Sequence, residues 1–377
     1  MPNLSMVPLL INSARIKYAV LDNLFSKVNI PHSEINFYMD GYYIFHKLYK
    51  SDYLVDIYKT DIDQFIKDAV VAVLNTVAHY RRYFATRMHK SNRIFIVFNR
   101  KKPSYQSILM KDYGRQYYEK LYPTHFQYGA INMIIEQALG LLENICQYID
   151  DVFIVDNRKV EDHVAVAFLE KQYVTGFNIY YTRNELMSVN LDNKSMILYP
   201  KRDESYLLTV ENYFQNFFGK VKYKPTFMTA EYAAYYFALS GVKSKSIPGT
   251  CVNGAVKGAK IIDSMIEDDT IDIHTSVNGF VYMLPKYLGR ELTKEETKNV
   301  TSLYKAISIR ANLAAMSSAS KTRMLNSLVN LYDQTGLEEL NNMLDSDDVL
   351  NLTDLNMNKV KIPKSYWNWD DMDWGQY

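Results

Sequence analysis

The sequence contains few cysteines and no apolar run long enough to cross a membrane. Its 2 cysteines, Cys146 and Cys251, lie far apart, so we expect neither a disulfide framework nor a cysteine-based zinc site. The 7 histidines do not have the spacing of an H-E-x-x-H metal motif. Charged residues interrupt every apolar run before about 18 residues, and the first residues lack the pattern of a secretory signal. These absences predict a cytoplasmic protein without a membrane span.

An excess of charge of one sign is also absent. Lys and Arg number 43 and Asp and Glu 42, which gives a net charge of +1 and excludes a surface that is basic throughout. Any contact with nucleic acid must therefore come from local basic patches. Tyrosine, in contrast, is abundant, with 32 residues. Tyr42, Tyr43, Tyr80 and Tyr83 could stack on bases, but packing in the core is the favoured interpretation.

Strands and long helices alternate over the first 200 residues. Apolar runs predict strands at 35–41, 93–98, 152–155, 178–182 and 196–198, and helical spacing predicts helices at 62–80, 129–149 and 159–172. This alternation predicts a mostly parallel α/β sheet flanked by helices. In such sheets the ligand crevice lies beyond the carboxyl ends of the strands. We therefore expect one site built from Asp40, Asn99 and the residues after Val155 and Thr182.

The character of the chain changes near residue 225. Two helices, at 230–240 and from 254 onward, are joined by a glycine-containing loop, and the exposed backbone N–H groups of such a hairpin can hold a phosphate. Residues 291–340 have a helical, polar pattern. Residues 343–377 contain seven Asp and three Lys, a net charge of −4. All 3 tryptophans, Trp367, Trp369 and Trp374, lie there, and we expect them to dock on the protein itself or on a basic partner protein.

The order of these segments resembles the flap endonuclease and 5′–3′ exonuclease family, which includes phage enzymes called RNase H. The matching pieces are Asp40-Gly41, Phe98-Asn99, the runs 159–165, 182–186 and 238–249, and then Gly254 and Lys257. The resemblance covers residues 35 to 265 and implies a PIN-like α/β core with a ring of carboxylates around two Mg²⁺ ions. It also implies an arch after the second strand and a helix–three-turn–helix unit that grips duplex DNA.

The resemblance implies three regions. These are a nuclease-like core at 1–225 with an arch at about 100–128, a helix-hairpin-helix DNA-binding region at 226–290, and a helical extension with an acidic, Trp-rich tail at 291–377. The residues expected to contact branched or duplex DNA are Arg100, Lys101, Lys102, Lys111, Arg115, Gly249, Gly254, Lys257 and Lys260.

The sequence departs from the family where the metal ligands should be. Asp40, Glu161, Asp162 and Glu185 are acidic, Asn99 and Val242 are neutral, and Lys159, Arg183 and Lys245 are cationic where the family has acids. Nine acids would sum to −9, whereas four acids and three bases sum to −1. One cation about 4 Å from a bound cation costs roughly 4 kcal/mol at an effective dielectric of 20. We therefore expect the three cations to pair with the four acids and no metal to be required.

These departures favour a flap-endonuclease-like protein that has lost its metal site. It would be a DNA-binding or structural component of a viral, phage-like nucleoprotein or virion assembly, and its location would be the host cytoplasm or the virion. An active structure-specific 5′ nuclease with a rearranged, Mg²⁺-dependent site is the first alternative. A protein-interaction scaffold that does not bind DNA is the second.

Overall fold

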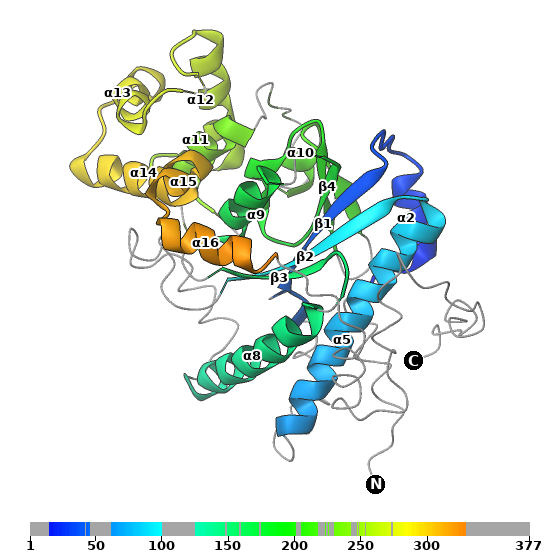
Figure 1. Cartoon of the computed structure of the whole chain (residues 1–377). Coiled ribbons are helices and arrows are strands. Elements are labelled where there is room, and N and C mark those ends of the chain that lie inside the picture. Colours follow the sequence, from blue (N-terminus) through cyan, green and yellow to red (C-terminus); the bar gives the residue numbers. More distant parts are fainter. Residues whose placement is uncertain are drawn as a thin grey trace.

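A six-stranded sheet forms the centre of the computed structural model (Figure 1). The structure describes residues 15–41, 43–45, 62–99, 125–147, 149–157, 160–172, 175–200, 205–217, 223, 225, 230–242, 247, 249–252, 254–272 and 274–328. The strands are β1 (Glu34–Asp40), β2 (Ser91–Asn99), β3 (Val152–Asn157), β4 (Phe177–Tyr181), β5 (Ser195–Tyr199) and β6 (Tyr206–Leu208). Their spatial order is β3-β2-β1-β4-β5-β6.

Parallel pairing brings the carboxyl ends of the central strands to one edge of the sheet. β1 pairs in parallel with both β2 and β4, β2 pairs with β3, and β4 pairs with β5. The strand order reverses beside β1, because β2 lies on one side of it and β4 on the other. Such a reversal opens a crevice at the carboxyl ends of the strands. Asp40 ends β1 at this point.

One face of the sheet is covered by helices from the first half of the chain. α2 (Tyr18–Phe25), α5 (Ile62–Arg82) and α8 (His125–Cys146) pack on this face, and a π-helical turn at Tyr83–Arg87 follows α5. Side chains alternate along a strand, so Phe37 and Met39 of β1 join this core, whereas Tyr38 faces the other side. The cluster consists of apolar and aromatic side chains; Tyr80 and Tyr83 are fully buried in it.

The other face of the sheet carries the second half of the chain. It is covered by α9 (Asp162–Glu170), the 3₁₀ helix η3 (Glu185–Asn190), α10 (Tyr213–Phe217) and α11 (Ala230–Ser240). Five further helices continue from there: α12 (Ala255–Glu267), α13 (Val277–Leu288), α14 (Lys294–Ile307), α15 (Ile309–Ala315) and α16 (Ser318–Asn326). Figure 1 shows these helices grouped on the side of the sheet away from α2 and α5.

The fold class predicted from the sequence is confirmed. The mostly parallel sheet, its flanking helices and the helical C-terminal region are present, and each predicted strand lies within about two residues of an observed one. The sequence did not predict β6, which pairs antiparallel with β5 through Tyr199 and Tyr206. A strand of three residues is too short to show a hydrophobic period. Within the described residues, no helix is both long and apolar enough to cross a bilayer.

Candidate functional site: the carboxyl edge of the sheet and a helical hairpin

Asp40 lies at the carboxyl edge and links β1 to β4. Its Oδ2 accepts a hydrogen bond from the Thr182 hydroxyl at 2.9 Å, and its Oδ1 accepts one from the backbone N–H of Tyr43 at 2.9 Å. Thr182 Oγ1 in turn accepts the backbone N–H of Asn184 at 3.0 Å. Asn184 then caps η3, because its side chain accepts the N–H of Leu186. Both oxygens of Asp40 therefore hold the chain that follows a strand, which is a structural role.

Arg183 and Asp40 act on the same tyrosine. Burial raises the pKa of Tyr43, the charge of Arg183 lowers it, and the charge of Asp40 raises it. The Arg183 side chain is exposed, and its guanidinium carbon lies 5.8 Å from the centre of the Tyr199 ring. The ring of Tyr43 packs edge-on against that of Tyr181, with centroids 5.6 Å apart. Asp40, Tyr43 and Arg183 thus share one corner of the sheet edge.

Three further carboxylates are buried at helix starts on the same side of the sheet. Glu161 is the N-cap residue of α9 and is 4% exposed, Asp162 begins α9 and is 7% exposed, and Glu185 begins η3 and is 3% exposed. The positive end of a helix dipole favours a carboxylate at the start of α9. A buried carboxylate needs compensating partners, because burial without them is costly. All three acids therefore need polar or charged neighbours at this end of the sheet.

The ion pairs expected between these acids and the three cations stay a prediction, because two of the cations are not described. Lys159 and Lys245 lie outside the described residues. Asn99 ends β2 opposite Asn157 of β3, and only the backbone of Asn99 is described. Val242 is fully buried and forms a β-bridge with Ile247, so it occupies an apolar position rather than a ligand position. The acids lie at the end of β1 and at the starts of α9 and η3, and Arg183 lies between β4 and η3.

The acids present can be compared with the two-metal centre that the resemblance implies. Mg²⁺ takes oxygen ligands in a near-octahedral arrangement, and a pair of ions needs several carboxylates around it. Among the residues that the structure describes, no group of three or more His, Cys, Asp or Glu side chains is placed to hold a metal ion. The described donors by themselves do not fit a two-metal centre.

The second candidate region is the hairpin formed by α11, α12 and the loop between them. The loop folds back on α11, because Thr250 N–H donates to the carbonyl of Leu239 at 3.0 Å and Thr250 Oγ1 donates to that of Ala238 at 2.7 Å. A Cβ at Gly249 would lie 2.5 Å from the carbonyl oxygen of Val252, so only glycine permits this approach. Gly254 precedes α12 with φ of 100°, which strongly favours glycine.

The start of α12 presents backbone N–H groups together with basic side chains. Gly254 provides no side-chain cap for the helix, so the first N–H groups of α12 are not capped from that position. Lys257 and Lys260 are exposed on the first turns, and Lys260 Nζ lies 5.6 Å from the centre of the Tyr223 ring. This is a suitable arrangement for anions. The other predicted DNA contacts, at Arg100, Lys101, Lys102, Lys111 and Arg115, lie outside the described residues, as does most of the predicted arch.

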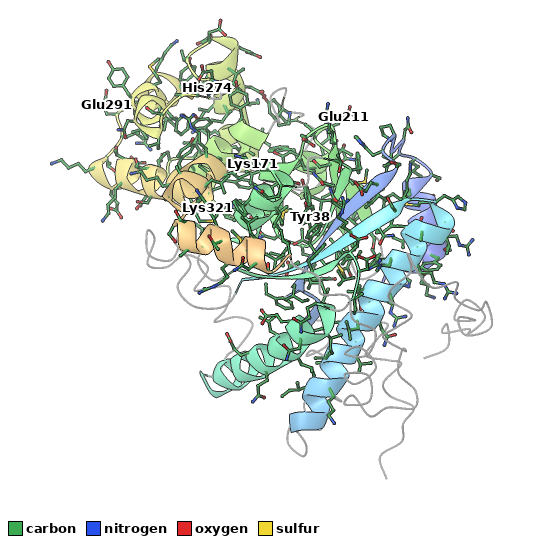
Figure 2. The ribbon with its side chains drawn as sticks, viewed as in Figure 1. Tyr38, Lys171, Glu211, His274, Glu291 and Lys321 are labelled. Carbon is green, nitrogen blue, oxygen red and sulfur yellow. The ribbon has the colours of Figure 1, made fainter. Side chains whose placement is uncertain are left out.

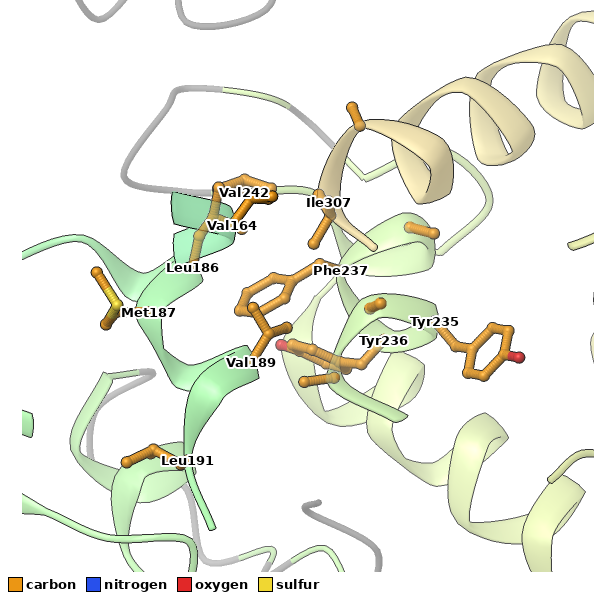
Figure 3. Packing of buried hydrophobic residues seen from close by; sticks show 14 of the residues in the cluster. Val164, Leu186, Met187, Val189, Leu191, Tyr235, Tyr236, Phe237, Val242 and Ile307 are labelled. Atoms are coloured by element: carbon orange, nitrogen blue, oxygen red, sulfur yellow. The ribbon is translucent and has the colours of Figure 1, made fainter. Parts of the chain in front are cut away.

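The hairpin and the carboxyl edge are joined through a buried apolar cluster. Figure 3 shows Phe237 and Tyr236 of α11 beside Val189 of η3, with Leu186 near Val164 and Val242. η3 begins with Glu185. Burial is the main cause that raises the pKa of Tyr236, and the charge of Glu185 adds to it. The candidate acid Glu185 therefore lies on η3, which packs against α11, the first helix of the hairpin.

Sequence reasoning missed two contributors to the sheet edge. The sequence marks Thr182 as the end of a strand and the start of the run 182–186 but gives its side chain no role, whereas its hydroxyl connects Asp40 to the cap of η3. Tyr181 was read as part of a strand, yet its ring links Tyr43 to Tyr80, with a centroid distance of 5.2 Å to the latter. A polar residue directly after a strand of a parallel sheet, as Thr182 is, was the available signal.

Comparison with known proteins gives similarity only at the level of solved structures. No family model matches the sequence, and no curated protein matches it. A structure of the D15 flap endonuclease of bacteriophage T5 with DNA and metal ions gives 11% identity and a TM-score of 0.46 over 83% of this chain and 100% of that chain. A structure of the T5 5′-exonuclease with bound zinc gives 12% identity and a TM-score of 0.45 over 82% of this chain and 98% of that chain.

Proposed function

We propose that this protein binds nucleic-acid backbone through the α11–α12 hairpin and does not cleave it. The observation that carries the proposal is the start of α12, where Gly254 gives the first backbone N–H groups no side-chain cap and the exposed Lys257 and Lys260 follow a loop that glycine keeps close to α11. Backbone N–H groups and lysines are the groups that hold phosphates without reading bases. The family resemblance of the same segment supports duplex or branched DNA as the ligand.

The absence of cleavage is argued from charge. Two divalent cations need a strongly negative ring of ligands, whereas the corresponding positions of this sequence sum to −1. Asp40, the first of these acids, already accepts hydrogen bonds from Thr182 and Tyr43 on its two oxygens. An acid with these two partners serves the local fold without a metal. The proposed protein therefore binds DNA without cleaving it: the hairpin holds the phosphates, and the sheet edge positions the hairpin.

Binding of a labelled 5′-flap DNA by the full chain tests the first half of the proposal. We expect log affinity to fall linearly with log salt concentration, and the double variant Lys257→Ala, Lys260→Ala to lower that slope by up to about 2. The matched control is Lys17→Ala, Lys27→Ala, which removes two exposed lysines near α2 and should leave the slope nearly unchanged. An equal effect of both variants would contradict a role of the hairpin.

Incubation of the same DNA with Mg²⁺ or Mn²⁺ tests the second half. We expect the DNA to remain intact at protein concentrations that saturate binding. Multiple-turnover release of 5′ products would refute the non-catalytic assignment and favour the active 5′ nuclease. Failure to bind any DNA at low salt would instead favour a protein-interaction scaffold.

A further inference from the structure

The helices that follow the hairpin contain an unusual charge pattern. From Thr297 to Leu328 the chain has five basic residues and no acidic one, although the whole protein has nearly equal numbers of each. We call these five residues the acid-free surface, after the run of sequence that contains them; they are Lys298 and Lys305 on α14, Arg310 on α15, and Lys321 and Arg323 on α16. The nearest acids along the chain are Glu295 and Glu296 in the first turn of α14. All five cations except Lys321, which is half-buried, are exposed. Figure 2 labels Lys321 on α16.

The position of the lysines on α14 follows from its packing. Val300, Leu303 and Ile307 are fully buried against the neighbouring helices. Lys294, Lys298 and Lys305 are four and seven residues apart, which places them in one stripe. At about 100° per residue this stripe is opposite the buried side of the helix. The lysines therefore face solvent.

Among the residues that the structure describes, these cations form no ion pairs, in contrast to their neighbours. In α12–α14, Lys286 pairs with Asp268 at 3.1 Å and Arg290 pairs with Glu296 at 2.5 Å. Within the described part of the chain, no carboxylate lies at salt-bridge distance from any of the five residues of the acid-free surface. Arg310 makes one hydrogen bond, from Nη1 to the carbonyl oxygen of His274 at 3.4 Å. Their positive charge therefore remains available to a ligand.

The surface is fixed relative to both candidate regions. Tyr304 of α14 stacks on Tyr235 of the hairpin helix α11, with ring centroids 4.9 Å apart. The α14–α15 turn is held to α9 by a hydrogen bond between His163 Nε2 and the carbonyl oxygen of Ile307 at 2.9 Å. α16 contacts β3. A ligand held on the acid-free surface would thus meet the hairpin and the sheet edge in a defined geometry.

We propose that the acid-free surface is a second binding surface for nucleic-acid phosphates, separate from the start of α12. This inference rests on the proposed DNA binding. Phosphate interfaces are strongly basic, whereas a protein interface needs a buried apolar centre. Among the described residues of α14–α16, Leu325 is the only large apolar side chain that is exposed. The composition therefore favours phosphates over a protein partner.

The test compares two quadruple variants of the full chain on a labelled DNA duplex. The first is Lys298→Ala, Lys305→Ala, Arg310→Ala, Arg323→Ala. The control is Lys17→Ala, Lys27→Ala, Lys171→Ala, Lys194→Ala. It removes four exposed lysines, of which two flank α2, one follows α9 and one precedes β5. Both variants lower the net charge by the same amount, so general electrostatic attraction is matched. Circular dichroism and the melting temperature establish that both variants are folded.

We expect the first variant to weaken binding about tenfold or more relative to the control and to lower the salt slope by about 2 or more. Equal affinities and slopes for the two variants would overturn the inference. The inference would also be overturned if DNA binding were unchanged while the tryptophan emission of the first variant shifted to longer wavelengths. The surface would then hold the acidic segment 343–377 instead of DNA. In either case a loss of binding in the Lys257→Ala, Lys260→Ala variant would leave the proposed function intact.

Discussion

The hairpin and the carboxyl edge of the sheet differ in the property on which each depends. The hairpin keeps a backbone shape, with a loop that approaches α11 so closely that Gly249 admits no side chain. The carboxyl edge keeps a topology, with Asp40 and Thr182 joined across β1 and β4, and it combines acids with the exposed cation Arg183. The two regions therefore depend on different properties, backbone shape in the hairpin and charge at the sheet edge. The proposed phosphate binding would depend mainly on the former, and metal chemistry would depend on the latter.

The largest expected effect concerns the shape of the hairpin. Gly249→Ala would place a Cβ 2.5 Å from the Val252 carbonyl oxygen and 3.1 Å from that of Leu239, so backbone must move. We expect a loss of about 3 kcal/mol in the free energy of unfolding, measured by denaturant titration, together with weaker DNA binding. Gly140→Ala in α8 is the control, because nothing lies within 4 Å of its added Cβ. An unchanged stability of Gly249→Ala would show that the loop can be rebuilt and would remove the contrast.

A second effect compares the two ends of α9. Asp162 lies at its start, whereas Glu170 at its end accepts a hydrogen bond from Tyr180. Burial raises the pKa of Glu170 to about 8, and the charge of Asp192 adds to this effect. Between about pH 4.5 and 8 the folded state therefore keeps a proton that the unfolded state has lost, so stability falls as the pH rises through this window.

Glu170→Gln removes this titration while keeping a group that can bond to Tyr180. We expect the variant to gain stability over the wild type as the pH rises from 5 to 9, by on the order of 4 kcal/mol, in thermal melts across this range. Glu211→Gln, at an exposed position, is the control and should show a constant difference. Parallel curves for Glu170→Gln and the wild type would mean that Glu170 is ionised in the fold.

A third effect tests whether cations neutralise the carboxyl edge. The triple variant Lys159→Ala, Arg183→Ala, Lys245→Ala should bind Mn²⁺ about tenfold or more tightly than the wild type, because removing nearby positive charge lowers the cost of adding a divalent cation. Isothermal titration calorimetry measures the affinity, and Lys17→Ala, Lys27→Ala, Lys194→Ala serves as the control. Tight Mn²⁺ binding by the wild type, or no gain in the variant, would contradict the neutral edge.

The smallest effect is spectroscopic and concerns the acidic C-terminal residues. All 3 tryptophans lie at positions 367–374, so the intrinsic tryptophan emission reports on that segment alone. If the segment docks on the protein itself, the emission should lie at shorter wavelengths than that of a free peptide of residues 360–377. Salt at 1 M should shift the emission towards that of the peptide, because the Debye length is then about 3 Å and attraction between more distant charges is screened. Identical spectra would favour docking on a partner protein instead.

Much of the fold followed from local patterns. The runs that became β1, β2 and β3 are apolar and bounded by polar residues, and α5 shows helical spacing over its whole length. The contribution of Thr182 could not be predicted in the same way, since its hydrogen bond to Asp40 joins residues 142 positions apart. The short strand β6 depends on its antiparallel partner β5 and not on a period of its own.

The sequence by itself determined the alternation of strands and helices, the near balance of charge, and the glycines of the hairpin loop. These are properties of single residues and of local periodicity. Only the tertiary structure decided that Asp40 is held by Thr182 and Tyr43, that η3 packs on α11, and that four of the five cations of the acid-free surface are exposed, with no carboxylate partner among the described residues. The physical reason is that these features depend on the distances between elements, which are fixed by the packing of both faces of the sheet.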